Sequence, residues 1–189
     1  MTLPRSHKFV NEVFLLKVME TERLVLRWLT PEDAEFMFEL LNDPTWIRFI
    51  GDRNIRTLQD ARNYVITGPM EMYTKLGFGL FLTELKDGHI PIGICGLIKR
   101  EGLEDVDIGF AFLSRYQSKG YAYEAASATM KYATEQLGLK RIVAITSEDN
   151  EASSTLLEKI GMTFEGYITL PNDKEELKLY GYGDSPPVE

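Results

Sequence analysis

The stretch Arg115-Tyr116-Gln117-Ser118-Lys119-Gly120-Tyr121-Ala122 decides the fold because it joins a strand pattern to a helix pattern. Apolar side chains alternate with polar or small ones over residues 106–113, and small apolar side chains recur at helical spacing over residues 121–137. The first N–H groups of a helix have no acceptor inside it, and the helix dipole adds partial positive charge there. A polar loop that contains Gly120 and opens a helix is therefore expected to bind an anion.

A second strand follows this helix. Residues 141–146 form a continuous apolar run, which is typical of a strand covered on both faces. A strand, a helix and a buried strand in this order make a βαβ unit, so the two strands should be parallel. On the first strand, Gly109 and Ala111 share a face with Asp107 and leave room there, as at a place where a ligand approaches the backbone.

Flanking patterns place this unit in one α/β domain of residues 19–183. Capping residues start helices at Thr30 and Thr57, and Gly68-Pro69 should break or kink the second helix. Strands are expected on both sides of the βαβ unit, over residues 23–29, 78–85, 90–98, 162–170 and 177–182, and a short helix over 150–160. Residues 1–18 are expected to be an N-terminal extension and residues 184–189 a disordered tail.

The segment from Thr45 to Arg56 is expected to be a loop between two helices. It holds Trp46, Phe49 and three arginines. A loop of this composition either lines a pocket or uses its aromatic side chains to hold itself against the core, and both interpretations stay open.

Composition excludes several kinds of site. The single cysteine, Cys95, excludes a disulfide framework and a multi-cysteine metal site, and is interpreted as a buried strand residue. The only histidines are His7, in the N-terminal extension, and His89, at or beside a hairpin turn. Neither a Ser-His-Asp triad nor a histidine-rich metal site can be built from them, so no metal is expected.

Charge and hydropathy limit the classes of partner that this protein is expected to bind. A formal charge of −8 argues against nucleic-acid binding and mildly favours small cationic partners. No apolar run approaches the ~18 residues that a membrane span needs. With no secretory signal in the sequence, the expected location is the cytoplasm, and both a monomer and a homodimer remain open.

Three segments in consistent order resemble the GNAT superfamily of N-acetyltransferases, over about residues 19–182. Gln117-x-x-Gly120-x-Ala122 resembles that family's acyl-CoA loop, and the run from Asn150 through Ser153 to Lys159-x-Gly161-Met162 resembles its next motif. Arg23-Leu24-x-Leu26-Arg27, followed by Thr30-Pro31-Glu32-Asp33, resembles the RimJ/RimL-like branch, which acetylates ribosomal proteins.

The resemblance implies a mixed, mostly antiparallel sheet with a central parallel pair that splays apart, and helices on both faces. It also implies that the loop amides hold the pyrophosphate of acetyl-CoA while the pantetheine arm lies in the gap between the splayed strands. The residues expected to bind acetyl-CoA are Phe112, Leu113, Gln117, Ser118, Lys119, Gly120, Tyr121, Ala122 and Asn150. For Lys119 a solvated surface position is the alternative, and for Asn150 a helix cap.

The implied reaction is direct attack of a neutral amine on the thioester. Asp107 is the candidate general base, with an arginine-paired structural carboxylate or a base-free route through water as alternatives. Ser153 is the candidate donor to the leaving thiolate, because Leu157 stands where many family members carry a tyrosine.

The sequence therefore predicts an acetyl-CoA-dependent N-acetyltransferase that acts on a primary amine. The acceptor is expected to be a protein N-terminus or a small cationic amine, in a pocket built from Trp46, Phe49 and Tyr180 or Tyr182. The alternative is a non-catalytic acyl-CoA-binding or sensing protein on the same fold, for which the missing tyrosine at Leu157 is the motivation.

Overall fold

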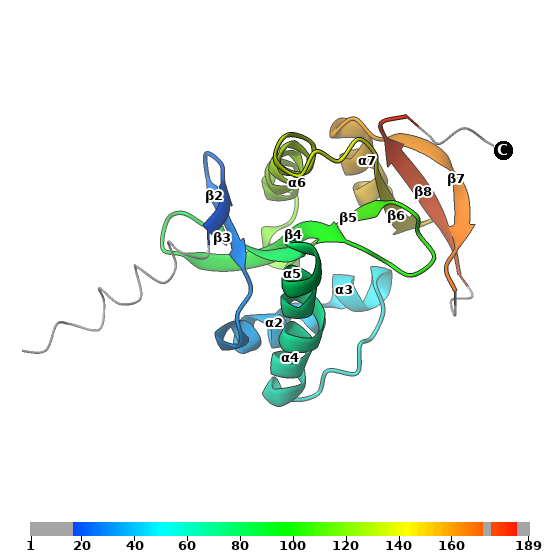
Figure 1. Cartoon of the computed structure of the whole chain (residues 1–189). Coiled ribbons are helices and arrows are strands. Elements are labelled where there is room, and N and C mark those ends of the chain that lie inside the picture. Colours follow the sequence, from blue (N-terminus) through cyan, green and yellow to red (C-terminus); the bar gives the residue numbers. More distant parts are fainter. Residues whose placement is uncertain (1–16, 172–174, 185–189) are drawn as a thin grey trace, which may run out of the picture.

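The structure, a computed structural model, describes residues 17–171 and 175–184 (Figure 1). Eight strands form one sheet in the order β1-β2-β3-β4-β5-β6-β8-β7. The strands are β1 (Lys17–Glu20), β2 (Leu24–Trp28), β3 (Leu80–Leu85), β4 (Ile90–Ile98), β5 (Val106–Phe112), β6 (Ile142–Ser147), β7 (Thr163–Thr169) and β8 (Glu176–Tyr182). The helical elements are η1 (Pro31–Asp33), α2 (Ala34–Leu41), α3 (Pro44–Phe49), α4 (Leu58–Val65), η2 (Ile66–Met70), α5 (Glu71–Leu76), η3 (Ser114–Tyr116), α6 (Tyr121–Lys131), η4 (Tyr132–Gln136) and α7 (Glu151–Lys159).

Neighbouring strands run antiparallel except for β5 and β6, which are parallel. The α6 helix connects these two strands, as the βαβ pattern in the sequence predicted. The mixed, mostly antiparallel sheet with one central parallel pair is confirmed.

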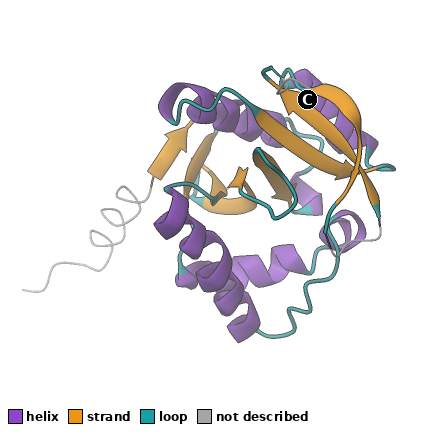
Figure 2. Ribbon diagram, turned by 45° about the vertical axis from the view of Figure 1, so that its right-hand side comes forward, coloured by secondary structure: helices purple, strands orange, loops and turns teal. Residues whose placement is uncertain are grey.

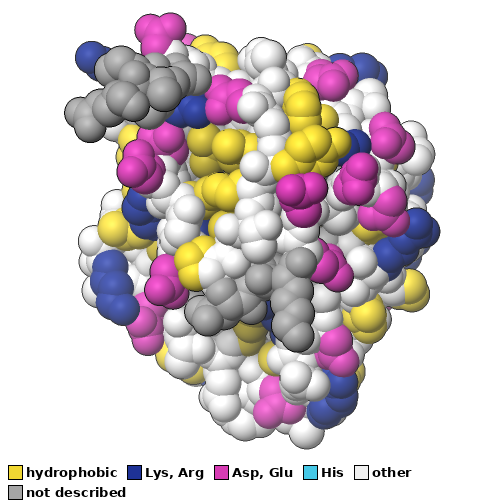
Figure 3. Space-filling view, turned by 90° about the vertical axis from the view of Figure 1, so that its right-hand side faces the viewer, with side chains coloured by type: hydrophobic (Ala, Val, Ile, Leu, Met, Phe, Trp, Pro, Cys, Tyr) yellow, Lys and Arg dark blue, Asp and Glu magenta, His cyan; other side chains and the backbone are white. Residues whose placement is uncertain are grey.

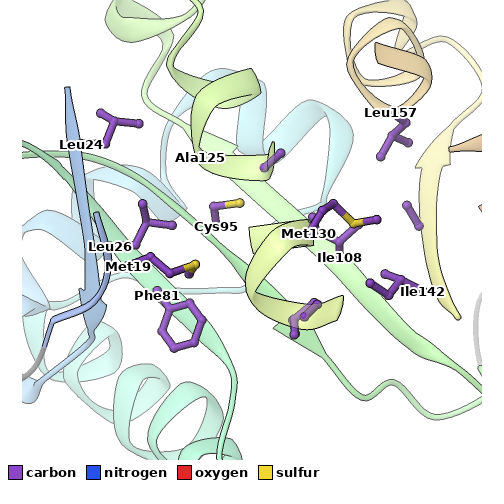
Figure 4. Packing of buried hydrophobic residues seen from close by; sticks show 14 of the residues in the cluster. Met19, Leu24, Leu26, Phe81, Cys95, Ile108, Ala125, Met130, Ile142 and Leu157 are labelled. Carbon is purple, nitrogen blue, oxygen red and sulfur yellow. The ribbon is translucent and has the colours of Figure 1, made fainter. Parts of the chain in front are cut away.

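Helices cover both faces of the sheet (Figures 1 and 2). On one face, small residues of α6 such as Ala125 and Ala126 pack against the central strands, so the helix lies close to the sheet. Figure 4 shows Cys95 in this layer with Ala125, Met130 and Ile108. The α2 and α4 helices bury their apolar sides in a second cluster on the opposite face.

Cys95 is fully buried, as expected. Its Sγ lies 3.3 Å from the hydroxyl of Thr129, and burial raises the pKa of its thiol to about 12. A thiol in that state is not a nucleophile at neutral pH.

The prediction of a loop from Thr45 to Arg56 is wrong over its first half, because residues 44–49 form α3. Asp43 caps this helix by accepting a hydrogen bond from the N–H of Thr45, and Pro44 occupies the first helical turn. The same Asp-Pro pair that ends α2 therefore starts the next helix, and residues 50–56 are the part of this segment that lies outside regular structure.

The Gly68-Pro69 pair produces a wide π-helical turn, η2, between α4 and α5. A proline cannot donate an N–H to the preceding turn, and the wider turn accommodates it without ending the helix. At the N-terminus, β1 begins at Lys17, two residues before the predicted start of the domain. The predicted extension up to residue 16 and the predicted tail from residue 185 lie outside the described residues.

Candidate active site

The β5 and β6 strands separate almost as soon as they pair. Their register contains only Val106 opposite Ile142 and Asp107 opposite Val143, although the strands are seven and six residues long. Beyond this vertex the facing edges of the two strands diverge. The predicted splay of the parallel pair is therefore present.

The separated edge of β5 offers backbone groups to a ligand. The N–H of Leu113 donates to Ile92 on the β4 side. Because N–H directions alternate along a strand, the N–H groups of Phe110 and Phe112 face the gap. An extended chain that entered the gap would add to this edge as a further strand does.

A cavity of about 530 Å³ opens along this gap. Its lining comes from α3, α4 and η2 on one side and from the loop before α6 and the α7 helix on the other. The predicted site residues that line it are Trp46, Phe49, Asp107, Phe112, Gln117, Ser118, Gly120, Tyr121, Ala122, Asn150 and Ser153.

Four predicted residues do not line this cavity. Leu113 is fully buried beside it, and the Nζ of Lys119 lies 5.3 Å from the ring centroid of Tyr116, outside the lining. Tyr180 is buried in the core, and Tyr182 lines a separate shallow depression beside β7 and β8. The closing strand therefore contributes neither tyrosine to the cavity wall.

The loop before α6 presents a set of free backbone donors. Within the described part of the chain, no N–H group from Ser118 to Tyr123 has an acceptor. Ser118 (φ 58°) and Gly120 (φ 81°) both adopt the left-handed conformation, which turns successive amides toward one concavity. A serine is strained there, and such strain is characteristic of ligand-binding loops. The loop at the start of an eleven-residue helix thus has the geometry of an anion site.

Side chains from distant segments hold this loop in place. Gln117 donates from Nε2 to the carbonyl of Phe112 at 2.9 Å and to the hydroxyl of Thr45 at 3.0 Å. Asp43, the cap of α3, also accepts hydrogen bonds from the N–H and the hydroxyl of Ser114. The anion loop, the end of β5 and the α3 wall of the cavity are consequently one connected unit.

The other side of the loop is fixed to the β1–β2 connection. Arg23 donates to the carbonyl of Lys119 at 3.1 Å and pairs with Glu124 at 2.6 Å. Glu124 accepts further hydrogen bonds from the N–H of Arg23 and the hydroxyl of Thr21. These contacts satisfy Glu124 outside the cavity and leave the amides at the start of α6 open.

Asp107 occupies the vertex where β5 and β6 separate. Its carboxylate is 1% exposed and accepts hydrogen bonds from Nε of Arg100 and from the N–H of Ile145 on β6. Burial raises the pKa of Asp107 to about 6, because desolvation outweighs the opposing effects of Arg100 and of the Ile145 N–H. A carboxyl with this pKa is mostly ionised at pH 7 and has the basicity of a general base. The arginine pair considered as the alternative is present, and it does not exclude the catalytic role.

Ser153 lies half-buried on the first turn of α7 and lines the cavity. Its hydroxyl has no hydrogen-bond partner in residues 17–171 and 175–184, whereas its N–H donates to Oδ1 of Asn150 at 3.1 Å. Asn150 therefore caps α7 and keeps its side-chain amide N–H groups for a ligand. Leu157, where a tyrosine was noted as absent, also lines the cavity.

Arg53, Tyr64 and Arg100 are among the lining residues that were not predicted from the sequence as site residues. They come from the segment before α4, from α4 itself and from the connection between β4 and β5. No local pattern marks them, because only the packing of α4 across the sheet brings them together. An arginine partner for Asp107 was predicted as an alternative, but the sequence did not indicate that it is Arg100.

Among the described residues, no group of three His, Cys, Asp or Glu side chains is arranged to hold a metal ion. In the same part of the chain, no helix is both long and apolar enough to cross a membrane.

Residues 23–163 match the model of the acetyltransferase (GNAT) domain. This chain belongs to the GNAT family. The match covers the anion loop, the splayed strands and α7, and it identifies the protein as a GNAT-type acyltransferase. The family and the fold predicted from the sequence are confirmed.

Known proteins agree with this assignment. The uncharacterised N-acetyltransferase YoaA of Bacillus subtilis is 30% identical over 156 residues, which cover 82% of this chain and 87% of YoaA. A GNAT-family acetyltransferase from Bacillus anthracis has a solved structure with a TM-score of 0.71 and 32% identity, covering 87% of this chain and 96% of its own. RimL, a ribosomal L7/L12 α-N-protein acetyltransferase solved with coenzyme A, shares the fold with a TM-score of 0.75, 16% identity and coverage of 88% and 97%.

Proposed function

We propose that this GNAT protein transfers the acetyl group of acetyl-CoA directly to a primary amine. The observation that carries the proposal is the loop of free amides from Ser118 to Tyr123 beside the open edge of β5. A pyrophosphate fits the first feature and an extended amide-bearing arm fits the second. Coenzyme A contains both, joined in one molecule.

The residues of the cavity suit this donor. The loop amides bind the phosphate oxygens, and the N–H groups of Phe110 and Phe112 pair with the amide carbonyls of the arm. Asn150 donates from its side-chain amide to the same arm. When bound, the thioester supplies an acetyl group that is activated toward nucleophiles, and these contacts hold it between β5 and β6.

Asp107 and Ser153 carry the proton transfers in the proposed reaction. The amine nitrogen forms the new amide bond as the C–S bond of the thioester breaks. Asp107 takes the proton that the amine nitrogen loses, directly or through a water molecule, and the Ser153 hydroxyl donates a hydrogen bond to the departing sulfur. Solvent supplies the proton that turns the thiolate into free coenzyme A.

An α-amine is the acceptor that this site activates most readily. With a pKa near 8, neutralising an α-amine at pH 7 costs about 1.4 kcal/mol, whereas a lysine-like amine costs about 4–5 kcal/mol. A base with a pKa of about 6, as Asp107 has, is matched to the smaller task. The resemblance to the RimJ/RimL-like branch supports the same acceptor class.

A calorimetric titration with acetyl-CoA, followed by thiol release in the presence of a panel of amines, tests the proposal. We expect micromolar binding and thiol release that depends on the amine. Absence of acetyl-CoA binding would refute the donor site. Tight binding with no thiol release for every amine would instead support the non-catalytic acyl-CoA-binding function. The observation that favours this second function is the apolar side chain of Leu157 in the cavity lining.

A further inference from the structure

The cavity wall near Asp107 carries two arginines and a tyrosine that the proposed transfer does not use. We propose that the acceptor amine carries a carboxylate or a similar anionic group close to its nitrogen, and that Arg53 binds this group. The inference rests on the proposed N-acetyltransferase function and names its substrate class. It favours an acidic α-amine over the polyamine or aminoglycoside that the net charge of the chain had favoured.

Arg53 lines the cavity without an ion pair or a hydrogen bond to any described residue. The adjacent carboxylate of Asp52 does not neutralise it, because Asp52 pairs with Arg56 and accepts the N–H of Asn54. The other arginine nearby in the sequence, Arg48, pairs with Asp149 at 3.0 Å. Arg53 is therefore the guanidinium of this segment that remains available to a ligand.

Arg53 lines the same cavity as Tyr64, Arg100 and Asp107. Both Arg53 and Arg100 act electrostatically on the phenol of Tyr64, and each opposes the rise in its pKa that burial causes. Arg100 in turn pairs with Asp107. The available guanidinium, the phenol and the candidate base therefore line one cavity, and the acceptor amine must lie in it beside Asp107.

The net charge of the described lining residues is opposite in sign to the net charge of the whole chain. Asp107 is the only carboxylate among the described lining residues, and Arg100 neutralises it. Arg53 and Lys159 then leave the described lining with a net positive charge, although the chain carries a formal charge of −8. Carboxylates are spread instead over the outer surface, as on the face that Figure 3 shows.

This arrangement selects between acceptors. A guanidinium forms two parallel hydrogen bonds with a carboxylate, and it repels a second ammonium group. A polyamine brings additional positive charge to Arg53. An amine with a nearby carboxylate brings the complementary charge, while its nitrogen lies toward Asp107.

Two kinds of acceptor carry this chemistry, and the test separates them. One arm uses free amino acids, with the matching amino acid amides as controls. The other uses short C-terminally amidated peptides with a free N-terminus and glutamate, glutamine or lysine at the second position. Spermidine serves as the cationic comparison. The measurement is kcat/KM for each amine with the wild-type protein, Arg53→Gln and Arg62→Gln, an exposed arginine of α4 outside the cavity.

We expect carboxylate-bearing amines to be preferred about tenfold or more over their amide counterparts, as one charged hydrogen-bonding contact predicts. Arg53→Gln should remove this preference without changing the affinity for acetyl-CoA, and Arg62→Gln should retain it. Equal use of spermidine and acidic amines, or a preference that survives Arg53→Gln, would overturn the inference and leave the acetyltransferase function intact. Failure of every amine to be acetylated would overturn both.

Discussion

Substitution of Asp107 by asparagine separates a catalytic carboxylate from a structural one. The asparagine oxygen can still accept the N–H of Ile145, so the vertex between β5 and β6 keeps that contact. What the substitution removes is the proton acceptor. Since general-base catalysis contributes about 10²–10⁴ in rate, we expect kcat to fall by about 100-fold at pH 7.

The pH dependence makes this test specific. A base must be ionised to act, and Asp107 has a pKa of about 6. The active fraction should therefore rise about tenfold between pH 5 and pH 7 and then level off. This limb of the kcat/KM profile should be present in the wild-type protein and absent in Asp107→Asn. A second limb near pH 8, from the amine itself, should be present in both.

Thiol release measured from pH 5 to pH 9, with calorimetry for acetyl-CoA, gives both quantities. Asp105→Asn is the matched control, because Asp105 lies two residues away, pairs with Arg141 and does not line the cavity. The control should keep the wild-type profile. If Asp107→Asn retains the limb near pH 6, or loses acetyl-CoA affinity in place of kcat, Asp107 is structural and the proposed base is wrong.

Three further substitutions test other parts of the structure. Gly120→Ala places a side chain at a φ of 81° and 3.3 Å from Nη2 of Arg23. We expect a loss of about 1–2 kcal/mol in unfolding free energy, measured by thermal unfolding, and weaker acetyl-CoA binding, measured by calorimetry. Unchanged affinity would argue against the loop as the phosphate site. Ser153→Ala should lower kcat about tenfold and leave the dissociation constant of acetyl-CoA unaltered, and a wild-type kcat would exclude Ser153 as the donor to sulfur. Arg27→Met leaves the buried carboxylates of Asp33 and Glu84 without the arginine that both share. Denaturant unfolding should show a loss of about 3–5 kcal/mol in unfolding free energy. A loss below about 1 kcal/mol would show that these ion pairs contribute little to stability.

Most of the residues proposed to bind the donor were predicted to lie at one site because their signals are local. Gln117, Gly120 and Asn150 lie at strand-to-helix junctions, where the chain itself positions backbone amides and caps. The small residues Gly109 and Ala111 on the same face as Asp107 marked the strand that borders the gap. Patterns of this kind depend on a few neighbouring residues, so sequence alone reveals them.

The acceptor half depends on contacts between distant segments. Arg53, Tyr64 and Arg100 line one cavity only after α4 has packed across the sheet, and no spacing in the sequence predicts this arrangement. Tyr180 was expected at the site because it lies on the closing strand. The register of β8 against β6 and β7 instead buries it beside Phe164, with ring centroids 5.7 Å apart. A shift of one residue in register decides such a placement.

The net charge of the whole chain does not describe the charges that an acceptor meets. The value of −8 sums residues over the entire surface, whereas an acceptor meets the few groups that line one cavity. There, positive charge prevails. Local pairing, as between Arg100 and Asp107, determines which charges remain for a ligand.

The most direct test of the proposed function is the stoichiometry of one turnover. Purified protein is mixed with acetyl-CoA and an α-amine peptide bearing an acidic second residue, and the free thiol and the acetylated peptide are quantified together by thiol titration and mass spectrometry. The structure predicts one acetylated peptide for each thiol released, and no release without the amine. Thiol release without acetylated peptide, or bound acetyl-CoA that stays intact with every amine, would contradict direct transfer to an amine.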